Sequence, residues 1–365
     1  MTTVLFTAFE PSGDRHAAPV VAELRQRHPD WRLLAAAGPF SQDAGAELVA
    51  ETASAGVMGL EAARRLREIP VLLHQLEAEL SGGGPIVHVP VDSPAAQFRI
   101  TPALRDRGAK TIHWVAPKIW ARRWDGRLGK LRRQTDGLAC LFPFEADWFT
   151  SRGIPAQFVG HPSFSRPVHA VPASGLPQAK HQIAVLPGSR GQEIRDNLPL
   201  MLHVLDRLKS EADMEAVIVA ADLRAEEQIK SIAKDGYVVR TGAIDEVLSW
   251  STFAFAVSGT VTLDVARHRR PGIGIYACGV ALRMVAGLLI RGLVLPPNLV
   301  LGREVMPELA PIGFDPDPVF QAVRNLLNDE EALSRQVDAW NTLHAMYSGH
   351  DPGAGVADLI DSVLD

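Results

Sequence analysis

The amino-acid sequence predicts an α/β protein of the GT-B-like class, with two Rossmann-like parallel-sheet domains and a C-terminal helical segment. Three observations indicate this class. The chain has 365 residues, more than one hydrophobic core usually organises. Short apolar runs alternate with longer segments of helical period, as in parallel sheets covered on both faces. The alternation stops at a proline-rich stretch and then starts again, as expected at a domain boundary.

The first half of the chain, residues 1–162, predicts an N-terminal domain. Its apolar runs, which we interpret as buried strands, are residues 4–8, 33–37, 85–91, 111–115 and 138–142. Its segments of helical period are residues 17–27, 62–80 and 102–107. The proline-rich and weakly patterned residues 163–180 are the expected linker.

The second half repeats the pattern and predicts a C-terminal domain over residues 181–317. Its expected strands are residues 183–186, 216–220, 237–240, 253–257 and 272–276. Residues 318–365 have helical period and no strand signal, so we expect C-terminal helices, which are candidates for packing back on the N-terminal domain.

Composition excludes several classes of protein. A net charge of -5 lacks the basic footprint of a nucleic-acid-binding protein. Cys140 and Cys278 are far apart and have no metal-ligand spacing, so we expect neither a zinc site nor a disulfide framework. The first residues carry no basic segment of the signal-peptide kind, and no stretch is apolar over about 18 residues. We therefore expect a chain that neither crosses a membrane nor is exported.

Two turns of the N-terminal domain carry polar residues directly after expected strands, where open parallel sheets bind ligands. The first follows residues 4–8 and contains Glu10, Ser12, Gly13 and Asp14. Either Ser12 or Asp14 is suited to cap the next helix, and Glu10 is expected at the cleft. The second turn contains Asp92, which is placed either to act as a general base toward a hydroxyl or to cap the following helix.

Two turns of the C-terminal domain predict an anion site. Gly188, Ser189, Arg190 and Glu193 open a helix, where backbone N–H groups and a guanidinium favour phosphate. Ser258, Gly259 and Thr260, with Asp264 one helical turn later, follow another strand in the same way. Together the turns predict one diphosphate held between two helix starts. This division places the nucleotide of a donor in the C-terminal domain and an acceptor with its base in the N-terminal domain.

Two further features are interpreted as structural. Residues 272–277 match a GxGxxA pattern, but they lie within an expected strand, whereas a dinucleotide fingerprint must follow one. His161, between Gly160 and Pro162 at the domain junction, is expected to have a hydrogen-bonding role.

Taken in order, the turns resemble lipid-A-disaccharide synthase, a family of inverting transferases with the GT-B fold. The matching segments run along nearly the whole chain: residues 10–14, 37–39, 57–59, 92–94, 110–117 with Trp120, 141–145, 159–162, 186–190 with Glu193, 258–260, 297–299, 302–304 and 307–309. Each segment is short, but their common order and spacing make the resemblance specific.

The resemblance implies transfer of a 2,3-diacylglucosamine from its UDP conjugate to 2,3-diacylglucosamine 1-phosphate. It implies Asp92 as the catalytic base, and Arg190, Glu193, residues 258–260, Asn298 and Arg303 on the UDP side. It implies no cofactor and no metal. The expected partners are therefore a UDP-sugar donor and an acylated sugar-phosphate acceptor, with the chain a monomer or homodimer.

Because both substrates carry acyl chains, we expect a cytoplasmic protein in peripheral contact with the inner membrane surface. Candidates for this contact are residues 58–80 and four basic residues, Arg122, Arg123, Arg132 and Arg133.

Several residues depart from the family pattern. They are Phe9, Ala95, Ser165, Asp264, Ala277 and Pro311. These departures leave two alternatives beside the lipid A reaction: a diverged paralogue that uses another UDP-sugar or acceptor, and a non-catalytic protein that binds UDP or lipid.

Overall fold

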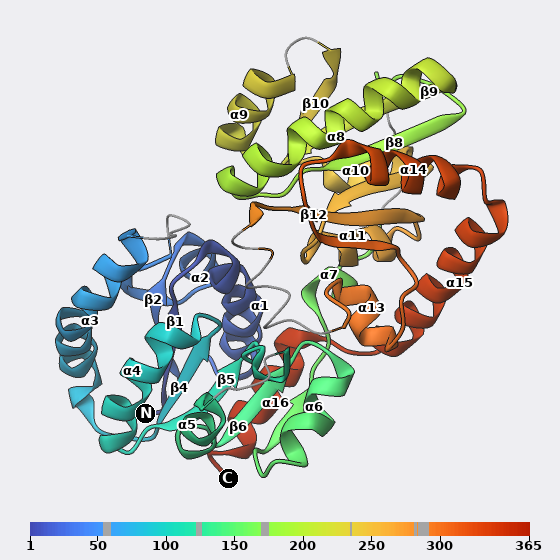
Figure 1. The fold of residues 1–365 in the computed structure, drawn as a ribbon. Helices are drawn as coiled ribbons and strands as arrows, with labels where there is room; N and C mark the ends of the chain where they lie inside the picture. The colour runs from blue at the N-terminus through green and yellow to red at the C-terminus, as the bar shows by residue number, and fades with distance from the viewer. Residues whose placement is uncertain (54–59, 122–125, 169–174, 234–235, 281–282, 284–291) are drawn as a thin grey trace. The chain divides into compact units, whose positions relative to one another are not determined.

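The computed structural model describes residues 1–53, 60–121, 126–168, 175–233, 236–280, 283 and 292–365, with the side chains of 60–67 and 121 left out. The chain divides into two compact units. The N-terminal unit comprises Met1–Ser165 and Gly349–Asp365, and the C-terminal unit comprises Arg166–Ser348. Each contains one parallel sheet with helices packed on it (Figure 1).

The N-terminal unit has a seven-stranded sheet in the order β3-β2-β1-β4-β5-β6-β7. The strands are β1 (Thr3–Ala8), β2 (Arg32–Ala37), β3 (Glu47–Glu51), β4 (Ile86–Val91), β5 (Lys110–Trp114), β6 (Gly137–Cys140) and β7 (Ala156–Phe158). The helices of eight residues or more are α1 (Pro11–Arg27), α3 (Leu60–Glu79), α4 (Pro94–Asp106), α5 (Arg127–Gln134), α6 (Pro143–Thr150) and α16 (Pro352–Ser362). Two shorter helices are α2 (Pro39–Asp43) and α7 (Pro162–Ser165).

The C-terminal unit has a six-stranded sheet in the order β10-β9-β8-β11-β12-β13. The strands are β8 (His181–Leu186), β9 (Met214–Ala220), β10 (Val238–Thr241), β11 (Phe253–Val257), β12 (Gly272–Ala277) and β13 (Glu308–Ile312). The helices are α8 (Gly191–Glu211), α9 (Leu223–Ala233), α10 (Ile244–Trp250), α11 (Val261–Arg267), α13 (Pro296–Leu301), α14 (Pro316–Leu327) and α15 (Glu330–Tyr347).

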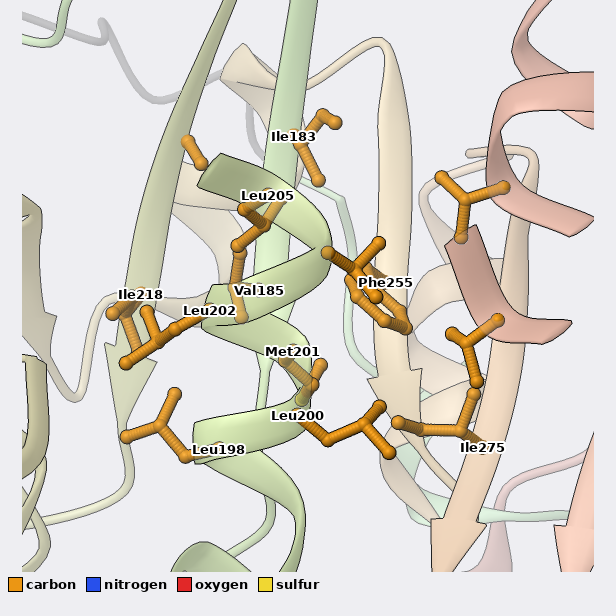
Figure 2. Packing of buried hydrophobic residues seen from close by; sticks show 14 of the residues in the cluster. Ile183, Val185, Leu198, Leu200, Met201, Leu202, Leu205, Ile218, Phe255 and Ile275 are labelled. Atoms are coloured by element: carbon orange, nitrogen blue, oxygen red, sulfur yellow. The ribbon is translucent and has the colours of Figure 1, made fainter. Parts of the chain in front are cut away.

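The central strands are buried on both faces, which explains their near-continuous apolar sequences. In the C-terminal unit, alternate residues such as Ile183, Val185 and Phe255 point to one face of the sheet. Leu198, Met201 and other residues of α8 cover them (Figure 2). Burying a side chain of this size contributes about 1.5–3 kcal/mol. The fold class predicted from the sequence is confirmed.

Three strands were not predicted, and all three are edge strands of the sheets. β3 is only partly buried and begins and ends with exposed glutamates. β7 has three residues, and β13 contains Pro311, which an edge strand tolerates because no neighbour needs its N–H group. Helix α4 also begins at Pro94, well before the predicted start at residue 102. Burial on one side only makes such elements weak in a sequence pattern.

The C-terminal helices are shared between the units. α14 and α15 pack in the C-terminal unit, α14 against α8 and α15 against α11. The chain then returns, and α16 packs on α1 in the N-terminal unit, where Arg27 and His28 pair with Asp361. Arg27 also pairs with Asp358 at 2.6 Å.

Candidate functional site

The two polar turns of the N-terminal unit lie next to each other. β1 and β4 are neighbouring parallel strands with Ala8 opposite Val91, so Glu10 and Asp92 follow strand ends at the same edge. The strand order reverses between β1 and β4, because β2 and β3 extend one way and β5 to β7 the other. Such a switch point is where open α/β sheets form a ligand crevice.

Asp92 has an unusual backbone conformation. Its φ is 51° and that of Ser93 is 47°, both in the left-handed region that non-glycine residues rarely adopt. The Asp92 N–H donates to the Trp114 carbonyl oxygen at 3.0 Å, which holds the turn to the end of β5. The alternative interpretation as a helix cap is wrong, because Ser93 is the N-cap of α4 and accepts no capping hydrogen bond. Backbone strain of this kind is typical of functional sites.

The turn after β1 differs from its prediction. Neither Ser12 nor Asp14 caps α1, since Glu10 is the N-cap residue and makes no side-chain cap. Asp14 lies inside α1, is fully buried, and accepts the N–H groups of Phe40 at 2.9 Å and Ser41 at 3.0 Å. It therefore caps α2 from a neighbouring helix. Glu10 is partly buried and Ser12 is exposed, so both are at the edge where the turn was predicted.

A buried polar network lies in the sheet behind Asp92. Thr7 on β1 bonds the His88 ring at 2.9 Å and donates to Gln97 at 2.8 Å, and Gln97 donates back to the Thr7 carbonyl oxygen at 2.7 Å. Burial lowers the pKa of His88 to about 3, with a smaller contribution from His113. Burial alone lowers the pKa of His113 to about 4. Both imidazoles are therefore neutral near pH 7. Sequence reasoning missed them because they occur within apolar strands.

The anion turns of the C-terminal unit also flank a reversal of strand order. β8 and β11 are neighbours, so the turns that follow Leu186 and Val257 share one edge. Arg190 is the N-cap of the long helix α8, and its side chain is half exposed. Its guanidinium pairs with Glu193 at 3.0 Å, while Glu193 also accepts the Arg190 N–H at 3.3 Å. Gly188 has φ 102°, and a Cβ there would lie 2.7 Å from the Glu193 carboxylate.

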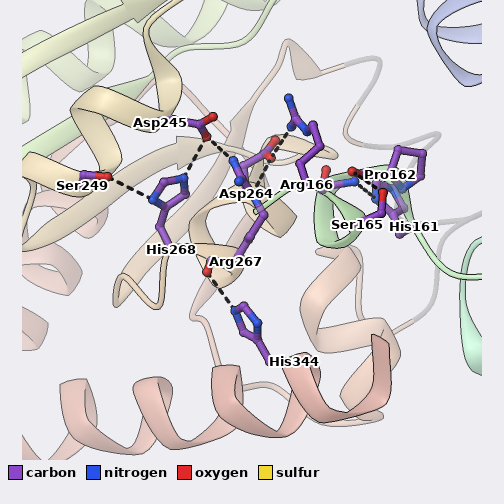
Figure 3. Close-up of polar contacts among 11 residues, drawn as sticks. His161, Pro162, Ser165, Arg166, Asp245, Ser249, Asp264, Arg267, His268 and His344 are labelled. Carbon is purple, nitrogen blue, oxygen red and sulfur yellow. Dashed lines mark hydrogen bonds and ion pairs between the residues drawn. The ribbon is translucent and has the colours of Figure 1, made fainter. Parts of the chain in front are cut away.

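The second anion turn is tied into its own unit. The Ser258 N–H, expected to be open to phosphate, donates to the Ile275 carbonyl oxygen at 2.7 Å. Gly259 is half-buried and Thr260 is exposed at the start of α11. The Asp264 carboxylate accepts a hydrogen bond from the Arg166 guanidinium at 3.2 Å, and it lies 3.5 Å from Nε of Arg267 (Figure 3).

Arg267 was not among the site residues predicted from the sequence. Its side chain is 1% exposed and pairs with Asp245, which also bonds His268 at 2.9 Å (Figure 3). Arg267 therefore forms ion pairs with two aspartates, and one of them, Asp264, belongs to the predicted turn.

Asn298 and Arg303 have different surroundings. Asn298 is fully buried, and both its amide nitrogen and its amide oxygen make hydrogen bonds to neighbouring residues. It donates to Met306 and Glu308 at 2.7 and 2.6 Å and accepts from Val305 and Met306 at 2.9 and 3.0 Å. It therefore shapes the loop before β13. Arg303 is exposed on that loop.

Other motif residues support the N-terminal sheet. The Glu145 carboxylate accepts hydrogen bonds from Trp120 Nε1 at 2.9 Å and from the Phe142 N–H at 3.1 Å. Burial raises the pKa of Glu145 to about 7. His161 accepts the Ser163 N–H at 3.1 Å, in keeping with its expected hydrogen-bonding role. The GxGxxA pattern lies in β12, so its interpretation as a strand is confirmed.

Some predicted residues lie outside the described part of the structure. These are residues 57–59, residues 169–174 of the predicted linker, Arg122 and Arg123. Within the described residues, no helix is long and apolar enough to cross a membrane. The same residues contain no group of three potential metal-binding side chains.

Two Rossmann-like units with polar turns at their switch points define the GT-B fold, and comparison with solved structures agrees. The Staphylococcus aureus MnaA–UDP co-structure has a TM-score of 0.66 at 13% identity, covering 100% of this chain and 96% of that one. Acinetobacter baumannii MurG has a TM-score of 0.56 at 14% identity, covering 99% and 100%.

Sequence comparison gives the family. The family model described as lipid-A-disaccharide synthetase matches residues 4–350. Lipid-A-disaccharide synthase from Anaeromyxobacter dehalogenans (strain 2CP-C) is 32% identical, over 96% of this chain and 94% of that protein. The enzyme of the same name from Pseudomonas aeruginosa (strain UCBPP-PA14) is 31% identical over 93% of both. The chain belongs to the lipid-A-disaccharide synthetase family.

Proposed function

We propose that this chain is an inverting glycosyltransferase that forms the lipid A disaccharide. The donor is the UDP conjugate of 2,3-diacylglucosamine, and the acceptor is 2,3-diacylglucosamine 1-phosphate. Family membership over nearly the whole chain supports the reaction. The observation that carries the assignment of roles is the pair of switch points, one with a carboxylate and one with an arginine at a helix start.

In the proposed mechanism, Asp92 is the base. Its carboxylate takes the proton of the acceptor 6-hydroxyl while that oxygen forms a bond to C1 of the donor sugar. The bond from C1 to the diphosphate oxygen breaks, and UDP leaves with the electron pair. Attack from the face opposite to UDP inverts C1. The left-handed turn holds Asp92 directly after β4, at the switch point where we expect the acceptor to bind.

In the same mechanism, Arg190 and the N-terminus of α8 stabilise the departing diphosphate. The helix dipole favours negative charge at this end, and the guanidinium can make two parallel hydrogen bonds to phosphate oxygens. Glu193 holds Arg190 in place before the donor arrives. The structurally similar MnaA was solved together with UDP, which supports a nucleotide-binding role for this fold.

The proposed acceptor is acylated, so we also propose contact with a membrane surface. Val71 on α3 is 65% exposed, and Arg133 on α5 is exposed. Each basic residue near an anionic membrane contributes about 1 kcal/mol of attraction. Flotation with vesicles containing anionic lipid should recover the wild-type chain more fully than an R133E variant, and equal recovery would contradict the role of Arg133.

The proposed function is tested with the variant Asp92→Ala. Disaccharide formation from the two acylated substrates, followed by mass spectrometry, should fall about 10²–10⁴-fold, the usual contribution of a general base. UDP binding measured by calorimetry should not change, because Asp92 is in the other unit. Asp106→Ala, at an exposed position of α4, is the matched control and should keep full activity.

Two outcomes would overturn the proposal. Full activity of the Asp92→Ala variant would remove the base. A wild-type chain that binds UDP but forms no disaccharide would favour the non-catalytic alternative, and conversion of the UDP-sugar without the acceptor would favour another reaction.

A further inference from the structure

His16 is on α1, a helix that packs against β4. Three residues earlier on the helix, Gly13 packs so closely that a Cβ there would lie 3.2 Å from the Ala8 Cβ and 3.5 Å from the Val91 carbonyl oxygen. Residues three apart lie on the same face of a helix. His16 therefore continues the face of α1 that contacts the strand end immediately before Asp92.

Trp114 at the end of β5 fixes His16 and Asp92 together. Its indole Nε1 donates to the His16 carbonyl oxygen at 2.9 Å, and the two rings meet edge to face with centroids 5.8 Å apart. Its own carbonyl oxygen accepts the Asp92 N–H at 3.0 Å. One residue thus holds the backbone of both His16 and Asp92, and its ring also contacts the imidazole.

The imidazole is neutral and has an unused ring nitrogen. Among the described residues, Nδ1 of His16 is buried without a hydrogen-bond partner. Burial lowers the pKa of His16, while the charge of Asp92 opposes that change. Among the residues that the structure describes, the His161 ring also faces His16, with centroids 6.3 Å apart. A buried nitrogen without a partner costs about 1–3 kcal/mol, so a role during the reaction would explain its retention.

We infer that His16 is a positioning residue for Asp92 and receives the proton that Asp92 takes from the acceptor. This inference rests on the proposed function. After the sugar oxygen has bonded to C1 and UDP has left with its electron pair, the proton on the Asp92 carboxyl moves to the imidazole, which releases it to water. Asp92 is thereby a carboxylate again for the next acceptor, and no other reactant is needed.

A double-mutant cycle tests this inference in the full-length chain. His16→Phe keeps an aromatic ring against Trp114 and His161 but has no ring nitrogen. It should lower kcat about 10–100-fold, below the effect expected for the base itself. In the Asp92→Ala background the same substitution should cost less than about 2-fold, because residues that act as one unit are strongly non-additive.

Two further measurements separate this role from a structural one. The Kd for UDP and the urea midpoint of His16→Phe should stay near the wild-type values. The acid limb of the wild-type pH profile of kcat/KM should include imidazole protonation. In the variant only the Asp92 carboxylate is left to be protonated, so the limb should move to lower pH. His16→Asn supplies a hydrogen-bonding amide that cannot carry the proton, so it should lose as much activity as His16→Phe.

The outcomes are distinct. An equal cost of His16→Phe in both backgrounds, full activity of His16→Phe, or full activity of His16→Asn would each overturn the inference while the base assignment stands. Full activity of Asp92→Ala, or no disaccharide from the wild-type chain, would overturn the proposed function and the inference with it.

Discussion

The two switch points have the same topology but use different chemistry. In the N-terminal unit, the edge carries the carboxylate of Asp92 on a strained backbone turn. The buried imidazoles of His88 and His113, in the strands before this edge, are neutral. In the C-terminal unit, the edge carries an exposed arginine at the start of a 21-residue helix. The first arrangement suits proton transfer, which needs a fixed geometry and little water. The second suits binding of a diphosphate, which needs positive charge that an incoming ligand can reach.

Among the changes that test this comparison, the largest is expected in the affinity for UDP when Arg190 is replaced. Arg190→Ala removes a charged hydrogen-bond donor and should weaken UDP binding by about 1.5–3 kcal/mol, which is roughly 10–150-fold in Kd. Isothermal calorimetry measures the change. Arg195→Ala is the control, because the Arg195 guanidinium lies on the same helix and donates to the exposed Gln192 side chain. Equal effects of the two variants would contradict the anion site.

An effect of intermediate size is expected from the buried imidazoles. His113 has a folded pKa of about 4, below the unfolded value near 6.5. Its contribution to stability is therefore complete above about pH 6.5 and is lost as the pH falls toward 4. At pH 5 this loss is about 2 kcal/mol.

The variant His113→Leu cannot bind that proton. Between pH 7 and pH 5, its free energy of unfolding in urea should fall by about 2 kcal/mol less than that of the wild-type chain. The comparison of pH dependences removes the effects of titrating groups whose pKa does not depend on His113, including Glu145. Parallel pH dependence of the two proteins would show that His113 is not buried as a neutral ring.

The smallest effect concerns the left-handed turn. Ser93 has φ 47° and ψ 54° and makes no capping hydrogen bond, so Ser93→Gly relieves an unfavourable conformation. Glycine has a larger conformational entropy in the unfolded chain, which offsets part of the gain. We therefore expect a net stabilisation of at most about 1 kcal/mol. Ala95→Gly, in the first turn of α4, should instead destabilise by about 0.5–1 kcal/mol. Urea midpoints measure both, and the same sign for both would argue against strain at Ser93.

Much of the fold and part of the site were predictable from the sequence. Buried central strands are nearly all apolar, so their positions and the parallel architecture follow from the pattern alone. The turns at Asp92 and Arg190 could be found because polar residues directly after such strands stand out. The edge strands β3, β7 and β13 could not, because their partial burial leaves no strong pattern.

By itself, the sequence determined the class of fold, the polar turns and the family motifs, since these depend on local composition and order. Only the tertiary structure decided what each polar side chain contacts. It assigned Asp14 to capping α2, Asn298 to its own loop and Arg267 to a buried ion pair. It also brought His16 and Asp92 to a common anchor on Trp114. Burial and long-range hydrogen bonds arise from parts of the chain that no local pattern connects.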